Sequence, residues 1–77
     1  MSRSFRPFPV ANEWTVGPAD AGLRLDKFLA APGRAGTRGR AVAAIERGKV
    51  LVNGEDAGPA DAARRVEARD VVRLWVD

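Results

Sequence analysis

Basic side chains are concentrated in the middle of this 77-residue sequence. The range from Arg24 to Lys49 contains seven basic and two acidic residues, whereas the rest of the chain contains six basic and eight acidic residues. A local excess of positive charge attracts polyanions, most often nucleic acids. The alternative interpretation is a solvated, arginine-rich surface, and charge alone does not separate the two.

The chain contains no cysteine and no histidine, which excludes several chemistries. Disulfide scaffolds, thiol catalysis, the usual zinc sites and imidazole general bases all require these residues. Glu55 and Asp56 flank a predicted turn, where carboxylates are ordinarily solvated. Gly33, Gly36 and Gly39 are not a phosphate loop, because no Lys-Ser or Lys-Thr pair follows them. We therefore expect no catalytic residue, no metal and no cofactor.

Two short helices must position the basic side chains, and the first is predicted over residues 25–31. Its apolar residues recur at the spacing of a face that packs on a core: Leu25, Phe28 and Leu29. Pro32 and the glycine after it end this helix. Arg24 and Lys27 lie near its start.

The second helix is predicted over residues 38–47, with Thr37 as the N-cap whose hydroxyl accepts from a free backbone N–H. Its apolar residues also share one face: Ala41, Ala44 and Ile45. At 100° per residue, Arg40 and Arg47 lie within about 20° of each other, away from this face. Gly48 is placed where helices end in a left-handed residue.

The remaining elements are strands, predicted near residues 13–16, 50–53 and 70–76. Asn53-Gly54 is a strong hairpin signal. Residues 1–12, which contain two prolines, are interpreted as a flexible N-terminal arm before a single domain of residues 13–77. We expect an α+β fold, in which two short helices pack on one side of a small, mainly antiparallel sheet. The predicted core contains these residues: Leu25, Phe28, Leu29, Ile45, Val52 and Leu74.

Four pieces of sequence carry a family resemblance when they are read in order. They are Arg24-Leu25-Asp26-Lys27-Phe28-Leu29, Thr37-Arg38, the run from Ile45 to Gly54, and Val66 followed by Asp70-Val71-Val72. In this order and at these spacings they resemble the S-four (S4) RNA-binding domain, named for a protein of the small ribosomal subunit. The resemblance covers roughly residues 23–76. The lead-in strand and Gly22 most resemble the N-terminal domain of the large-subunit pseudouridine synthases.

The resemblance implies a helix–loop–helix and a hairpin that together grip structured, ribosomal RNA. Carried over by position, it implies RNA contacts from Arg24, Lys27, Thr37, Arg38 and Lys49. Helix geometry adds Arg40, Arg47 and the loop residue Arg34. We expect the basic residues of the two helices and of the hairpin entry to project onto one side. We further expect a cytoplasmic monomer that needs neither a membrane nor a small-molecule cofactor.

The sequence departs from the family pattern at three places. Thr37 replaces the usual serine but keeps its hydroxyl. The loop at Pro32-Gly33-Arg34 lacks the usual apolar residues, which places its packing in question. Arg69 stands where the family usually has glycine, so it is strained if this turn requires a positive φ.

Asp26 has a catalytic interpretation that we set aside. Pseudouridine synthases carry a catalytic aspartate in a similar Arg-Leu-Asp string, usually after histidine, whereas Leu23 precedes the string here. We interpret Asp26 as an acid favoured at a helix start, and the chain as a module without catalysis of its own. Trp14 and Trp75 are expected to pack on the sheet rather than to stack on bases. Two alternatives stay open: a free-standing ribosome-associated RNA-binding protein, and a protein-interaction module with an acidic partner.

Overall fold

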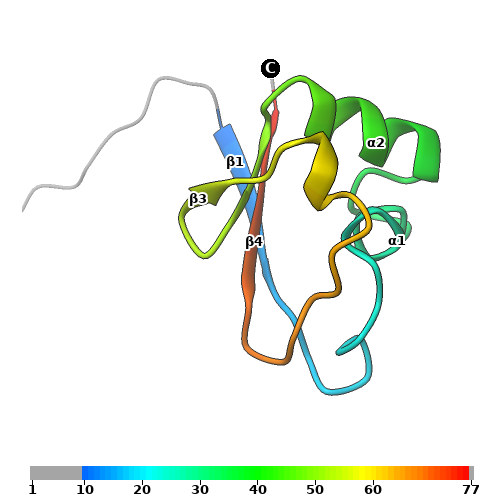
Figure 1. Cartoon of the computed structure of the whole chain (residues 1–77), viewed down its shortest axis with the longest axis vertical. Coiled ribbons are helices and arrows are strands. Elements are labelled where there is room, and N and C mark those ends of the chain that lie inside the picture. Colours follow the sequence, from blue (N-terminus) through cyan, green and yellow to red (C-terminus); the bar gives the residue numbers. More distant parts are fainter. Residues whose placement is uncertain (1–9, 77) are drawn as a thin grey trace, which may run out of the picture.

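The computed structural model describes residues 10–76 and has the expected α+β architecture (Figure 1). Its elements are β1 (Val10–Thr15), α1 (Leu25–Leu29), α2 (Arg38–Glu46), β2 (Val50–Val52), β3 (Glu55–Asp56), the 3-10 helix η1 (Pro59–Asp61) and β4 (Val71–Val76). Strand β1 begins inside the range assigned to the N-terminal arm, because three further residues pair with β4. The rest of that arm, residues 1–9, lies outside the described residues, as does residue 77.

The four strands form one antiparallel sheet in the order β1-β4-β2-β3. The hairpin between β2 and β3 turns at Asn53 and Gly54, whose φ angles are 54° and 85°. A two-residue turn with both φ angles positive matches the right-handed twist of the strands, so the predicted hairpin is confirmed. Strand β4 lies between β1 and β2 and brings the two ends of the described chain together.

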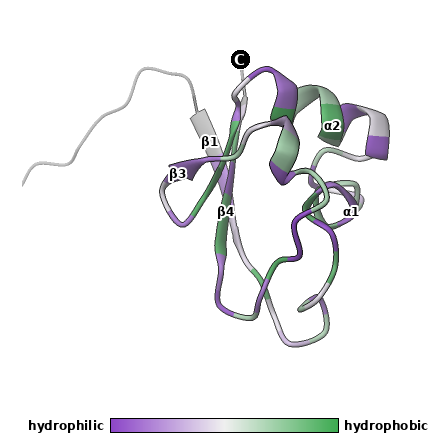
Figure 2. Ribbon diagram, viewed as in Figure 1, coloured by the Kyte–Doolittle hydropathy of each residue, from purple (hydrophilic) through white to green (hydrophobic). Residues whose placement is uncertain are grey.

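Both helices lie on the same side of the sheet (Figure 1), and the core lies between these two layers. All six predicted core residues are buried, as are Val16, Val50, Val66 and Val72. The pairs Val50–Leu74 and Val52–Val72 join β2 to β4 on the core face. Hydrophobic residues occupy the middle of α2 and hydrophilic residues its two ends (Figure 2). Trp14 is partly buried and packs against this core, as expected.

The observed helices are slightly shorter than the predicted ones. Helix α1 stops at Leu29, two residues before the expected end, and the chain then turns so that the Ala35 N–H donates to the Leu29 carbonyl at 2.7 Å. Ala35 packs against the core, which resolves the question of how this loop packs without larger apolar residues. Helix α2 ends at Glu46, and Gly48 follows with φ 74°, as predicted for a helix stop.

The turn before β4 contains the strained residue that the family comparison pointed to. Arg69 has φ 77°, in the left-handed region that glycine adopts at lower cost. Asp70 stabilises the turn, because its carboxylate accepts from the Glu67 N–H at 2.9 Å and from Asn53 Nδ2 at 3.1 Å. Asn53 Oδ1 in turn accepts from the Val71 N–H at 2.9 Å. The hairpin turn and the last turn are therefore joined by side chains.

Candidate nucleic-acid interface

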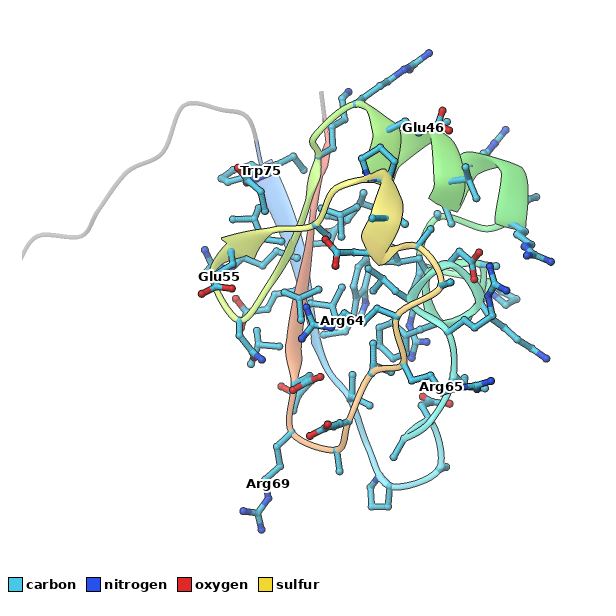
Figure 3. The ribbon with its side chains drawn as sticks, in the orientation of Figure 1. Glu46, Glu55, Arg64, Arg65, Arg69 and Trp75 are labelled. Carbon is cyan, nitrogen blue, oxygen red and sulfur yellow. The ribbon has the colours of Figure 1, made fainter. Side chains whose placement is uncertain are left out.

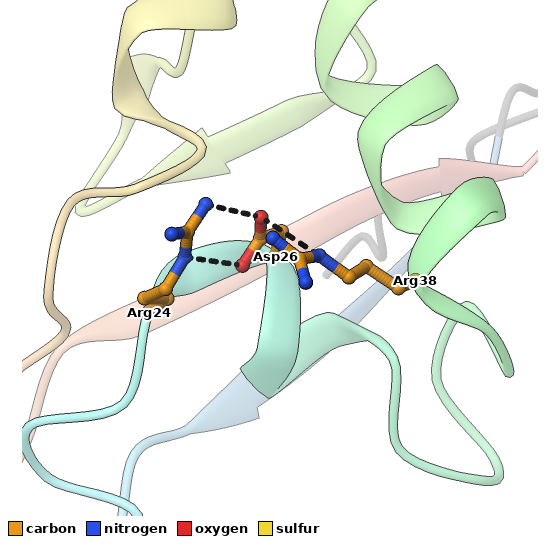
Figure 4. Close-up of polar contacts among 3 residues, drawn as sticks. All are labelled: Arg24, Asp26 and Arg38. Atoms are coloured by element: carbon orange, nitrogen blue, oxygen red, sulfur yellow. Dashed lines mark hydrogen bonds and ion pairs between the residues drawn. The ribbon is translucent and has the colours of Figure 1, made fainter.

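The start of α1 and the start of α2 meet at a buried carboxylate, in what we call the Asp26 cluster (Figure 4). Arg24 donates to Asp26 through two nitrogens, with Nε–Oδ1 at 3.2 Å and Nη2–Oδ2 at 3.0 Å. Arg38 forms an ion pair with the same carboxylate, with Nε–Oδ2 at 3.5 Å. Asp26 is only 1% exposed, whereas the side chains of Arg24 and Arg38 are 41% and 65% exposed.

The electrostatics of the Asp26 cluster favour the charged states of Asp26 and Arg24. Hydrogen bonds from Arg24 hold the pKa of Asp26 below its ordinary value, and the charges of Arg24 and Arg38 act in the same direction while burial opposes them. The contact with Asp26 raises the pKa of Arg24. The cluster therefore contains two cations and one anion, and its excess positive charge lies on the two exposed guanidinium groups.

Thr37 and Lys27 lie beside the Asp26 cluster. Thr37 caps α2 as predicted, because its Oγ1 accepts from the Arg40 N–H at 3.1 Å. Lys27 is exposed on α1, directly after the buried Asp26. The carboxylate of Asp26 is thus covered by two arginines and is not presented to solvent. This placement supports its interpretation as a structural acid at the start of a helix.

Arg34 makes more contacts within the fold than the sequence suggests. Its Nη1 donates to the Phe28 carbonyl at 2.8 Å, and its Cζ lies 3.9 Å from the centroid of the Phe28 ring. Its Nη2 also lies 3.6 Å from Asp20 Oδ2. A stacked and hydrogen-bonded guanidinium holds the α1–α2 loop against α1. Arg34 therefore has a packing role in addition to the RNA contact that we predicted.

A second group of cations surrounds an open hollow of about 320 Å³ between α2 and the end of β4. Four of the residues that line it are basic, and we call them its rim: Arg34, Arg40, Arg47 and Lys49. Four others are apolar, and we call them its floor: Ala35, Ala43, Ala44 and Leu74; Trp75 completes the lining. We call this feature the basic hollow.

The basic residues thus form two groups, which corrects our expectation of a single side. At 100° per residue, Arg38 and Arg40 leave α2 about 160° apart. Arg38 turns toward α1 and Asp26, whereas Arg40 and Arg47 border the basic hollow. The sequence placed all three arginines at the second helix but did not reveal that Arg38 contacts Asp26 of α1, on the side away from the basic hollow.

Sequence reasoning also missed Arg65 as a member of the basic surface. Arg24 and Arg65 face each other in an antiparallel bridge, and paired residues of such a bridge have neighbouring side chains on one face. Arg65 Nη1 donates to the Gly22 carbonyl at 2.7 Å, and its side chain is exposed beside the segment that leads into α1 (Figure 3). No local pattern indicates this position, because the pairing joins residues 41 apart in sequence.

Metal-binding clusters and membrane-spanning helices are absent from residues 10–76. No group of three carboxylate, histidine or cysteine side chains is arranged there to hold a metal ion. None of the helices in the described part of the chain is long and apolar enough to cross a membrane.

Comparison with known proteins identifies the family. The family model of the S4 domain matches residues 23–72, which include both helices, the β2–β3 hairpin and the start of β4. No curated protein and no solved structure matches the chain significantly. The match covers well over half of the sequence, so the chain belongs to the S4 domain family. The domain is an RNA-binding module that has no catalytic activity by itself.

Proposed function

From its membership of the S4 domain family, we propose that this chain binds structured ribosomal RNA through the Asp26 cluster and the basic residues around it. The observation that carries the proposal is the position of Arg24 and Arg38 on either side of one buried carboxylate. Asp26 fixes the directions of both guanidinium groups, and each keeps a large exposed fraction for a ligand. A pair of oriented guanidinium groups with excess positive charge suits a phosphate diester.

The N-terminus of α2 strengthens the attraction for phosphate at this position. Arg38 is the first residue of α2, and the first turn of a helix leaves backbone N–H groups without intrahelical partners. Thr37 satisfies only the N–H of Arg40 with its side chain. A phosphate at this end gains backbone donors and the favourable end of the helix dipole, in addition to the guanidinium of Arg38.

The chemistry of this surface favours recognition of RNA shape over recognition of base sequence. Arginine and lysine contacts to phosphate position a protein on a nucleic acid but carry little sequence information. The paired regions of RNA are read mainly through the backbone and the 2′-hydroxyls. We therefore expect a folded RNA stem to be the ligand, and the identity of its paired bases to have little effect on the affinity.

We also propose that the domain acts in the cytoplasm as the monomeric N-terminal targeting domain of an RNA pseudouridine synthase. The resemblance of the lead-in strand and Gly22 supports this context, and in the fold Gly22 makes a defined turn with φ 91°. A reading frame that continues beyond Asp77 into a catalytic domain would support the assignment. A stop codon directly after Asp77 would support the free-standing RNA-binding protein instead.

The test of RNA binding is a salt titration by fluorescence anisotropy with a labelled ribosomal RNA stem-loop. If about four cations meet phosphates, log K should fall with log[salt] with a slope of about −3 to −4. An absence of binding at low salt would contradict the proposal. The protein-interaction alternative predicts that a partner captured from lysate stays bound after nuclease treatment, whereas RNA-mediated capture is lost.

A further inference from the structure

We propose that the basic hollow receives one unpaired nucleotide of the bound RNA, with its phosphate at the rim and its base on the apolar floor. This inference rests on the proposed function, because the Asp26 cluster would hold the neighbouring RNA stem. The hollow lies on the other side of α2 from Arg38, so the two features can contact different parts of one RNA. The ligand class is thus a stem with a bulged or flanking unpaired residue.

The size of the hollow agrees with a ligand of this kind. Its volume is about 320 Å³, at the lower end of the range of about 300–1,000 Å³ that is typical of small-molecule sites. Alanine at positions 43 and 44 leaves this space open, because each side chain is a single methyl group. A base inside a paired stem is stacked and cannot enter a hollow, whereas an unpaired base can turn outward into one.

Two cations of the rim, Arg40 and Arg47, are available to a phosphate. None of the residues lining the hollow is acidic. Arg40 and Arg47 are exposed, and neither forms an ion pair within the part of the chain that the structure describes. An incoming phosphate therefore displaces no carboxylate from these two guanidinium groups. This differs from the Asp26 cluster, where one anion already lies between the arginines.

The floor suits the face of a base. Ala43, Ala44 and Leu74 supply an apolar surface, and the guanidinium planes at the rim can stack on a base as well as bind a phosphate. Successive residues of a strand point to opposite faces, and Leu74 faces the core. Trp75 accordingly extends to the side of the sheet turned away from α2 (Figure 3). The proposed base contact is therefore mainly with the floor, and Trp75 lies at its border.

The experiment compares two fluorescein-labelled RNA hairpins that differ only by one bulged uridine. The wild-type domain should bind the bulged hairpin about tenfold more tightly, the scale of one apolar pocket contact. Ala43→Leu fills the hollow without changing its charge, and leucine favours helix nearly as well as alanine. This variant should lose the preference for the bulged hairpin and keep its affinity for the fully paired hairpin. Ala63→Leu, at an exposed position outside the hollow, is the matched control and should behave as wild type.

The outcomes separate this inference from the proposed function. Equal binding of both hairpins by wild type, or equal losses for both in Ala43→Leu, would overturn the nucleotide site and leave stem binding in place. Failure to bind either hairpin at low salt would overturn the proposed function itself. If Ala43→Leu does not fold, a 4-thiouridine at the bulge supplies a second measurement in the wild-type protein. Its ultraviolet cross-link should map to the residues that line the basic hollow, and a cross-link elsewhere, Arg38 included, would contradict the site.

Discussion

Arg24 and Asp26, two residues apart in sequence, form a two-nitrogen ion pair at 3.0 and 3.2 Å although Asp26 is almost completely buried. The pair joins the segment before α1 to α1 itself, and the contact of Arg38 with the same carboxylate joins α1 to α2. One side chain thus links the core to the exposed cations. Asp26 is a structural residue whose loss should affect both folding and RNA binding.

Replacement of Asp26 by asparagine should destabilise the domain by about 1.5–3 kcal/mol, the usual range for a hydrogen bond to a charged group. The size of the side chain is preserved, but the charge that holds Arg24 and Arg38 is removed. The measurement is urea unfolding followed by tryptophan fluorescence. Asp20→Asn is the matched control: its ion pair with Arg34 spans 3.6 Å at a more exposed carboxylate, so the loss should be smaller.

The stability of the domain should fall in acid because two carboxylates have lowered pKa values in the folded state. Hydrogen bonds from Arg24 lower the pKa of Asp26, and the Glu67 N–H and the Asn53 amide lower the pKa of Asp70. The unfolded chain then binds more protons, so the stabilisation is present above an unfolded pKa of about 3.9 and is lost as pH falls through the folded values. Unfolding curves between about pH 6 and pH 2 should show this loss, with a shallower pH dependence in Asp26→Asn. An identical pH dependence in that variant would contradict the role of Asp26.

Replacement of Arg69 by glycine should stabilise the domain by about 0.5–1 kcal/mol. The left-handed conformation costs a residue with a side chain about 1–2 kcal/mol, and glycine avoids this cost. Part of that gain is offset because glycine has greater conformational freedom in the unfolded chain. The Arg69 side chain extends into solvent at the end of the molecule (Figure 3), so little packing is lost. Ala68 has no positive φ, so Ala68→Gly relieves no strain and should lower the stability of the domain. A lower urea midpoint for Arg69→Gly would show that the turn is not strained.

The parts of the fold that local sequence determines could be predicted. The Asn53-Gly54 hairpin, the Thr37 cap and the Gly48 helix stop each follow from the backbone preferences of one or two residues. The buried face of α2 follows from the spacing of Ala41 and Ile45. The structure contains these elements at, or within a few residues of, their expected positions.

The arrangement of the site could not be predicted, because it depends on contacts between distant residues. The bridge between Arg24 and Arg65 extends the basic surface. It joins the residue before α1 to a residue that follows η1, far along the chain. The sequence predicted Asp26 as an acid at the start of a helix. Its contact with Arg38 could not be predicted, because it requires the packing of α1 against α2. The division of the cations into the Asp26 cluster and the basic hollow follows from the helical angle between Arg38 and Arg40 together with that tertiary contact.

Replacement of Ile45 by alanine should cost about 2–5 kcal/mol, a large part of the stability of so small a domain. Ile45 is 1% exposed, and its side chain is part of the core between the helices and the sheet. Loss of three carbons removes buried apolar contacts and leaves a cavity in the core. Leu51→Ala, at a half-buried position of β2, should cost less. Thermal melting with circular dichroism measures both variants. Equal shifts of the melting temperature would show that the apolar face of α2 is not the principal contact of the helix with the core.

Arg38 should contribute more to RNA binding than Arg73. Arg38 lies at the N-terminus of α2, where backbone donors and the helix dipole add to its charge, and Asp26 orients its guanidinium. Arg73 is also exposed but pairs with Glu13 at 2.8 Å on the strand face opposite the core. Arg38→Ala should weaken binding to all RNA stems similarly and make the salt slope shallower by about 0.7–0.9, whereas Arg73→Ala should leave both nearly unchanged. The measurement is a salt titration of wild type and both variants against one ribosomal RNA stem-loop. Equal losses for the two variants would mean that RNA does not approach through the Asp26 cluster.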